Sequence, residues 1–160
     1  MVSSSHDKLV KVWDLSGGTC LQTLSGHENG VKTASFSNNG KFVASGSYDN
    51  TIRMWCLEDE KCEFVLENAH VDGVNCISFN LKDTKLLSGG CDGLIKLWDI
   101  EKQICLEKIC GHSMAVTKVI FGKDDKEIVS CSLDGTVRVF CLDKHCGEDC
   151  YLMEWSSSMN

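Results

Sequence analysis

The chain has 160 residues, of which 42% are hydrophobic and 24% charged, and its formal net charge is −7. This composition is typical of a soluble globular protein, and the acidic balance argues against the basic stripe that phosphate backbones require. No apolar run approaches the ~20 residues of a membrane-spanning helix, and the N-terminal residues do not resemble a signal peptide. We therefore expect no direct nucleic-acid partner and no membrane.

A nine-residue pattern recurs along the chain. It reads SHDKLVKVW from Ser5, SYDNTIRMW from Ser47, GCDGLIKLW from Gly90 and SLDGTVRVF from Ser132. Each copy has Asp third and a large aromatic residue ninth, and the aromatic residues are spaced by 42, 43 and 42 residues. A constant period of this length indicates a tandem array of one structural unit.

Short segments rich in β-branched and aromatic residues predict four strands in each unit. In the unit that begins at His27 they cover 31–36, 42–47, 51–55 and 62–66, and the units from His70 and His112 repeat the offsets of its first three segments. The fourth strands that follow Trp13 and Trp98 are expected over 20–24 and 105–109. Asp-Gly and Asp-Asn dipeptides between the second and third segments are strong tight-turn signals. The unit is therefore an antiparallel meander of four strands.

Apolar residues on both faces of each sheet predict that the sheets stack on their neighbours, as the blades of a β-propeller do. The expected divisions are a partial first blade (second to fourth strands) over 1–26, a second blade over 27–68, a third over 69–110, a fourth over 111–147, and a tail or last strand over 148–160. The fold class is therefore all-β: an incomplete propeller with three full blades and a partial first one.

Two dipeptides make the sequence resemble the WD-repeat family of β-propellers. Gly26-His27 and Gly111-His112 match the GH dipeptide of that family, and Trp13-Asp14 and Trp98-Asp99 match its WD dipeptide. The resemblance covers roughly residues 2–142 and implies a platform for protein–protein interactions.

The resemblance also implies a hydrogen-bonded relay in each sheet. A buried indole needs an acceptor, and in this family a serine hydroxyl provides it, meeting in turn a histidine and the turn aspartate. Two full sets are His27, Ser45, Asp49 and Trp55, and His70, Ser88, Asp92 and Trp98. A third set, His112, Ser130, Asp134 and Phe140, has no indole, and the first has only Ser3, Asp7 and Trp13.

Serine, histidine and aspartate together also suggest a hydrolase. A nucleophilic serine needs a base in an open cleft beside oxyanion donors. Three copies at equivalent positions of a repeat favour structural networks, and the sequence has no phosphate loop or HExxH motif. We expect a non-enzymatic protein without a cofactor.

Eleven cysteines are many for this length, and an odd number without an export signal favours free thiols in the cytosol or nucleus. Cys20, Cys62 and Cys105 each follow a blade aromatic by seven residues, so we expect them to be core positions. Cys141, His145, Cys146 and Cys150 form one cluster, although their spacing matches no common zinc pattern. A metal- or redox-responsive protein that uses this cluster is the alternative function.

The docking face implied by the resemblance carries the loop before each first strand and the turn between the second and third strands. Its exposed positions flank the first-strand valine and precede the turn aspartate. The expected partner-binding residues are Lys32 and Tyr48, Asn75 and Cys91, and Thr117 and Leu133. Tyr48 is the best single anchor, because aromatic residues dominate interface hot spots. The expected partner is a protein or peptide segment.

Propellers of this family usually have about seven blades, and about four is the practical minimum for closure. The simplest interpretation is a partial propeller: a fragment, a short isoform or an incomplete gene product. Its open faces could be covered in a homodimer or by the repeats of another protein.

Overall fold

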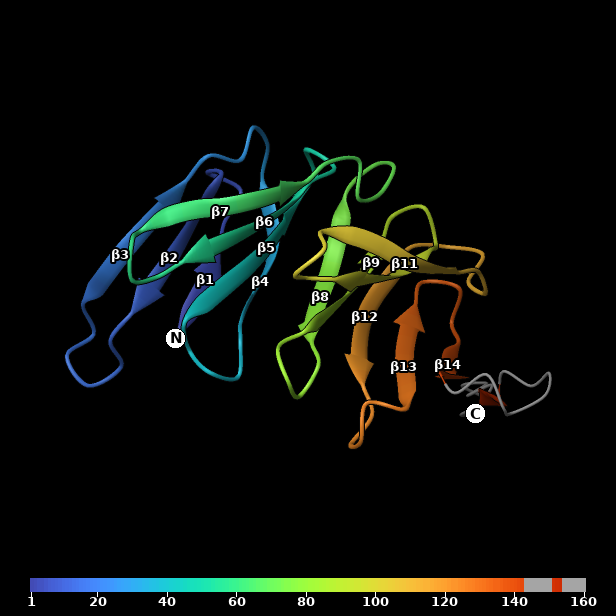
Figure 1. Cartoon of the computed structure of the whole chain (residues 1–160). Coiled ribbons are helices and arrows are strands. Elements are labelled where there is room, and N and C mark those ends of the chain that lie inside the picture. The colour runs from blue at the N-terminus through green and yellow to red at the C-terminus, as the bar shows by residue number, and fades with distance from the viewer. Residues whose placement is uncertain (143–150, 154–160) are drawn as a thin grey trace.

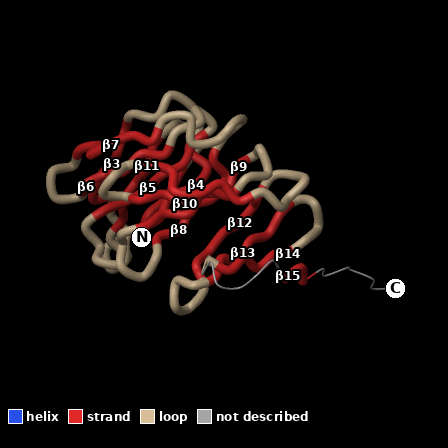
Figure 2. Tube along the Cα trace, turned by 45° about the vertical axis from the view of Figure 1, so that its right-hand side comes forward, coloured by secondary structure: helices blue, strands red, loops and turns tan. Residues whose placement is uncertain are grey.

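The computed structural model describes residues 1–142 and 151–153, and these residues contain strands and no helix. Consequently no helix in this part of the chain is long and apolar enough to cross a membrane. The strands form four separate antiparallel sheets that follow one another along the chain (Figures 1 and 2). The predicted all-β, incomplete propeller is confirmed, and its ring is not closed.

Each sheet is a meander in which every strand pairs with the next one in sequence. The first sheet contains β1 (Val2–Ser4), β2 (Leu9–Trp13) and β3 (Cys20–Ser25). The second contains β4 (Val31–Phe36), β5 (Phe42–Ser47), β6 (Ile52–Cys56) and β7 (Lys61–Leu66). The third contains β8 (Val74–Phe79), β9 (Lys85–Gly90), β10 (Ile95–Asp99) and β11 (Ile104–Ile109). The fourth contains β12 (Val116–Phe121), β13 (Glu127–Ser132), β14 (Val137–Cys141) and β15 (Tyr151–Met153).

The turn between the second and third strands of each full sheet requires a residue with positive φ. Asn50, Gly93 and Gly135 occupy this position with φ values of 71°, 75° and 81°. Glycine and asparagine adopt this backbone conformation most readily. Lys8 takes the same place in the first sheet with φ 74°, at a greater steric cost.

Three hydrophobic clusters hold the sheets together, one between each neighbouring pair. The cluster between the first and second sheets contains Val10 and Trp55, and the next one joins Met54 to Trp98. The cluster between the third and fourth sheets joins Leu97 to Phe140. The inner strands β4, β8 and β12 also pack against one another in that order. Each sheet therefore depends on its neighbours for burial of its apolar faces.

Two glycines allow this close approach of the sheets. A Cβ atom added to Gly46 would lie 2.5 Å from Cγ1 of Val74, and one added to Gly89 would lie 2.6 Å from Cγ1 of Val116. These contacts are shorter than side-chain atoms tolerate. Glycine is thus needed where the first strand of the following sheet crosses β5 and β9.

The prediction that Cys20, Cys62 and Cys105 are all core residues is wrong for Cys20, whose side chain is exposed. Cys62 and Cys105 are partly buried against the clusters between sheets. The side chain at this position points toward the side on which the preceding sheet packs. Within the described residues no sheet precedes the first one. The exposure of Cys20 follows from that open face.

Candidate protein-interaction face

Each full sheet contains a relay in which a histidine is hydrogen-bonded to a serine and to an aspartate. In the second sheet Nδ1 of His27 lies 2.8 Å from Asp49, Nε2 lies 2.7 Å from the Ser45 hydroxyl, and the Trp55 indole donates to that hydroxyl at 2.8 Å. In the third sheet the corresponding distances are 2.9 Å for His70–Asp92, 2.7 Å for His70–Ser88 and 2.9 Å for Trp98–Ser88. In the fourth they are 2.9 Å for His112–Asp134 and 2.8 Å for His112–Ser130.

The direction of each relay follows from the chemistry of its members. The indole can only donate and the carboxylate can only accept, so the serine hydroxyl donates to Nε2 and Nδ1–H donates to aspartate. In the second sheet, burial lowers the pKa of His27, and the Asp49 carboxylate opposes this effect. Burial alone would raise the pKa of Asp49, but hydrogen bonds from Thr51, Glu28 N–H and His27 lower it to about 2. The neutral histidine and ionised aspartate are therefore the resting forms.

The other relays vary this pattern. Burial also lowers the pKa of His70, and the pKa of Asp134 is lowered because hydrogen bonds from Thr136 and His112 outweigh its burial. Phe140 is buried in the place of the tryptophan but has no donor for Ser130. In the first sheet the Trp13 indole donates to Ser3 at 2.8 Å.

Asp7 lies at the turn of the first sheet, where it accepts a hydrogen bond from the N–H of Leu9 at 3.1 Å. Asp49, Asp92 and Asp134 likewise accept a hydrogen bond from the backbone N–H two residues later, which belongs to Thr51, Leu94 and Thr136. The turn aspartate therefore braces its hairpin even in the sheet that has no relay histidine.

The relay serines are not placed to act as nucleophiles. Ser45, Ser88 and Ser130 are 0% exposed, and each hydroxyl is hydrogen-bonded to its histidine. A substrate carbonyl cannot reach them without separation of the sheets. What the relays do is satisfy polar groups between packed sheets and brace the turn that follows the second strand.

A bulge at the start of each first strand places one residue outside the ladder. The register with the second strand shifts between Val31 and Thr33, between Val74 and Cys76, and between Val116 and Lys118. The residues left unpaired are Lys32, Asn75 and Thr117. Because bulges redirect a side chain, these three point to the face at which the turns lie.

The residue before each turn aspartate meets this bulge. The backbone N–H groups of Tyr48, Cys91 and Leu133 donate to the carbonyls of Gly30, Gly73 and Ala115 at 3.0, 3.1 and 3.0 Å. Each sheet thereby presents a pair of side chains: Lys32 with Tyr48, Asn75 with Cys91, and Thr117 with Leu133. Two of the pairs are directly bonded, since Lys32 Nζ donates to the Tyr48 hydroxyl at 2.9 Å and the Cys91 thiol to Asn75 Oδ1 at 3.4 Å.

The six residues expected to bind a partner lie around one pocket of about 310 Å³. Ala115 completes the lining, which is drawn from the second, third and fourth sheets. That these residues bind a partner stays a prediction.

Tyr48 contacts one residue of the first sheet and one of its own sheet. His6 stacks on its ring with a centroid distance of 5.6 Å, and the Lys32 ammonium lies 5.3 Å from the ring centroid. Gly73 leaves the room for this arrangement, because a Cβ atom there would lie 3.0 Å from Cδ1 of Tyr48. His6 therefore covers one face of the tyrosine ring, and Lys32 engages its hydroxyl.

Sequence reasoning missed two groups of functional side chains. The hydroxyls of Thr51 and Thr136 donate to the relay aspartates at 2.7 and 2.6 Å, and their position two residues after the aspartate was the available signal. On the opposite face, Asp83 accepts from the backbone N–H groups of Asn38 and Asn39 at 2.7 and 2.9 Å. Asp125 does the same for Leu81 at 3.1 Å. No local pattern predicts these clamps between sheets.

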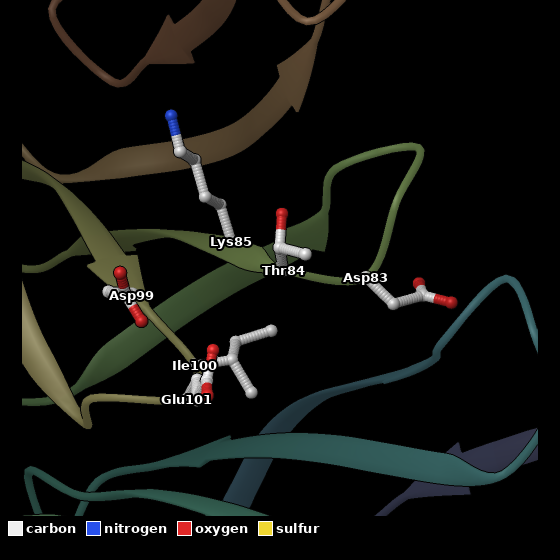
Figure 3. A pocket seen from close by; sticks show the side chains of 6 residues that line it. All are labelled: Asp83, Thr84, Lys85, Asp99, Ile100 and Glu101. Atoms are coloured by element: carbon white, nitrogen blue, oxygen red, sulfur yellow. The ribbon is translucent and has the colours of Figure 1, made fainter.

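Two other pockets share no lining residue with the one at Tyr48. One of about 290 Å³ lies beside the Asp83 clamp, where the Lys85 side chain points away from Asp83 and Glu101 (Figure 3). A second, of about 120 Å³, is lined by polar groups around Arg53. In the part of the chain that the structure describes, no group of three or more His, Cys, Asp or Glu side chains could hold a metal ion. His145, Cys146 and Cys150 of the predicted Cys/His cluster lie outside the described residues.

Comparison with known families and proteins identifies the repeat. The family model described as "WD domain, G-beta repeat" matches residues 18–56, 60–99 and 103–141. Each matched segment covers the last strand of one sheet and the first three strands of the next. The sequence repeat is therefore staggered across the sheets.

Several curated relatives are similar to less than half of the chain. The Nuclear distribution protein PAC1 of Arthroderma benhamiae is 45% identical over 71 residues, which are 44% of this chain and 15% of that protein. The Lissencephaly-1 homolog 1 of Paramecium tetraurelia is 47% identical over 70 residues, or 44% of this chain and 17% of that protein. The Nuclear distribution protein nudF 1 of Talaromyces marneffei is 46% identical over 69 residues, or 42% and 15%. The aligned part thus spans about a sixth of the length of these relatives.

Proposed function

The chain belongs to the WD-repeat family, and on this premise we propose that it is a non-enzymatic adaptor subunit. It binds a protein or peptide segment on the face lined by Lys32, Tyr48, Asn75, Cys91, Thr117 and Leu133. The observation that carries the proposal is the convergence of these side chains from three sheets on one pocket. Rigid sheets that present side chains from separate repeats are suited to binding extended partners.

Exposed apolar area on this face supports the proposal. Leu133 is 63% exposed at the pocket, and Met114 in the loop before β12 is 51% exposed. Exposed apolar side chains beside polar groups are typical of interaction surfaces. A polar rim here consists of the Lys32 ammonium and the Asn75 amide.

The proposal is tested by affinity purification of the tagged chain from a cell lysate, followed by identification of its partners. The Tyr48→Ala, Leu133→Ala double variant should lose the partners that the wild-type chain retains. The matched control is the Leu81→Ala, Ile104→Ala variant, since these side chains are 61% and 48% exposed and lie outside the pocket. Partners retained at wild-type affinity by the pocket variant would contradict the proposed face.

The outer face of the fourth sheet supports a second contact. Val129 pairs with Val139, and Cys131 with Val137, on the face opposite to Ile128 and Phe140, which pack on the third sheet. We propose that another sheet covers this apolar face, in a homodimer or as repeats of another protein. Sedimentation of the purified chain separates the two: a soluble monomer contradicts the homodimer, and a defined dimer contradicts coverage by the repeats of another protein.

We propose the cytosol or nucleus as the location, which the free thiols of Cys56, Cys76 and Cys91 support. Two of the three relatives are named nuclear distribution proteins. Because one fold serves many functions, the likeness supports the adaptor role rather than that particular process.

A further inference from the structure

The polar groups that remain unpaired at the pocket are hydrogen-bond donors. An ammonium group has three N–H donors, and the one hydrogen bond formed by the Lys32 ammonium within the described residues is that to Tyr48. None of the ion pairs in this part of the chain involves Lys32. The Tyr48 hydroxyl, which accepts from Lys32, keeps its own proton to donate.

The Asn75 amide adds further donors. Its oxygen accepts a hydrogen bond from the Cys91 thiol at 3.4 Å, whereas its nitrogen has no acceptor within residues 1–142. The Thr117 hydroxyl is turned away from this role, because it donates to the backbone carbonyl of Cys131 at 3.2 Å. One end of the pocket thus presents N–H and O–H groups from the second and third sheets.

The other end of the pocket is apolar and belongs to the fourth sheet. Leu133 and Ala115 lie there, and no carboxylate contributes to the lining. A basic ligand would therefore find no counter-charge, while an anionic one would find the Lys32 ammonium. The net charge of −7 does not oppose this, because salt at physiological strength screens charges beyond about 8 Å.

We propose that the pocket recognises a peptide segment in which an aspartate or glutamate stands beside a large apolar residue. The carboxylate accepts hydrogen bonds from Lys32 and Asn75, and the apolar side chain packs on Leu133 and Ala115. The Tyr48 hydroxyl holds the Lys32 ammonium at this end of the pocket. This inference rests on the proposed adaptor function and specifies the chemistry of the partner.

The test uses a phage-displayed library of random dodecapeptides selected on the purified chain. Peptides enriched on the wild type should share an acidic residue next to Leu, Ile, Phe or Met. An enriched peptide is then synthesised with a fluorescent label in its acidic form and with Gln or Asn in place of the acid. Anisotropy titrations give the Kd of both for the wild type, Lys32→Gln and the control Lys118→Gln, which is exposed on β12 but outside the lining.

We expect Lys32→Gln to raise the Kd of the acidic peptide about tenfold, because a hydrogen bond to a charged group is lost. The amide peptide should bind the wild type about as weakly as the acidic peptide binds Lys32→Gln, and Lys32→Gln should not weaken its binding further. Lys118→Gln should bind the acidic peptide within about twofold of the wild type. Enriched peptides that lack an acid but lose affinity on Leu133→Ala would overturn the acidic partner and leave the adaptor face standing. If no pocket variant weakens any enriched peptide, both the inference and the proposed face fail.

Discussion

Trp55 and Ser45 are joined by a hydrogen bond of 2.8 Å between two side chains that are 2% and 0% exposed. The same hydroxyl bonds to His27, so one serine satisfies two buried groups, one from β6 and one from the loop before β4. An unpaired buried donor or acceptor costs about 1–3 kcal/mol. Removal of the serine therefore leaves more buried polar groups without a partner than removal of any other member of the relay.

Ser45→Ala should lower the free energy of unfolding by about 2–4 kcal/mol, because both the Trp55 indole and Nε2 of His27 lose their partner. Ser130→Ala is the matched control. It leaves only His112 unpaired, since Phe140 has no donor, and should cost about 1–2 kcal/mol less. Urea denaturation of both variants measures the difference. Equal losses would show that the indole hydrogen bond contributes nothing to stability.

The relays also predict that stability depends on pH. The pKa values of His27 and His70 are lowered from 6.5 by burial, so below that pH the unfolded chain binds protons that the folded chain does not. The free energy of unfolding should therefore fall as the pH falls below about 6.5. A second decrease should follow between pH 3.8 and about 2, where the unfolded chain protonates the carboxyl of Asp49 before the folded chain does.

Urea denaturation at pH 7.5, 5.5, 4.0 and 2.5 measures this dependence. The His27→Gln, His70→Gln variant serves as the control, since it removes both titrating groups of the first decrease. Its stability should be lower at pH 7.5 and should change less between pH 7.5 and 5.5. A wild-type free energy that stays constant over that interval would contradict the neutral, buried state of these histidines.

The strands were predictable because their signals are local. Fourth strands expected over 62–66 and 105–109 are observed as Lys61–Leu66 and Ile104–Ile109. Alternation, turn dipeptides and the constant period act over a few residues, and the repeat supplies each signal several times. The burial of Cys20 could not be predicted in the same way, because it depends on whether another sheet covers the first one.

The candidate face was predictable as a set of positions but not as a geometry. The resemblance placed Lys32 and Tyr48 at exposed positions, whereas the bulge that unpairs Lys32 depends on the register of two strands. The stacking of His6 on Tyr48 requires the first and second sheets to be packed together. Such contacts between distant segments leave no pattern in one sequence.

The clamp at Asp83 gives a prediction about cohesion between sheets. Its carboxylate accepts hydrogen bonds from the N–H groups of Asn38 and Asn39 and from the Asn38 amide, all in the preceding sheet. Asp83→Asn removes the charge of the acceptor and keeps a residue type that tolerates the φ of 56° at this position, so it should lower the free energy of unfolding by about 1–2 kcal/mol. Asp124→Asn is the control, because the bond of its carboxylate to Lys126 N–H lies within one turn of the chain. If both variants lose the same amount in urea denaturation, the clamp adds nothing to the contact between sheets.

The closest approach of two sheets gives the last prediction. Gly46→Ala would place a methyl group 2.5 Å from Cγ1 of Val74, so β4–β7 and β8–β11 must move apart or Val74 must leave its rotamer. Overpacking of this kind costs about 1–3 kcal/mol. Cys131 occupies the equivalent position of the fourth sheet, where no sheet within the described residues covers it, and Cys131→Ala should stay within about 0.5 kcal/mol of wild type.

A double-mutant cycle with Val74→Ala tests the cause. This substitution removes the atom nearest to the new methyl group, so it should cost less in the Gly46→Ala background than in the wild type, by more than about 0.5 kcal/mol. Additive losses would mean that Gly46 is needed for the conformation of β5 itself. A favourable coupling would instead locate the requirement for glycine in the packing of one sheet on the next, which is the contact on which the whole array depends.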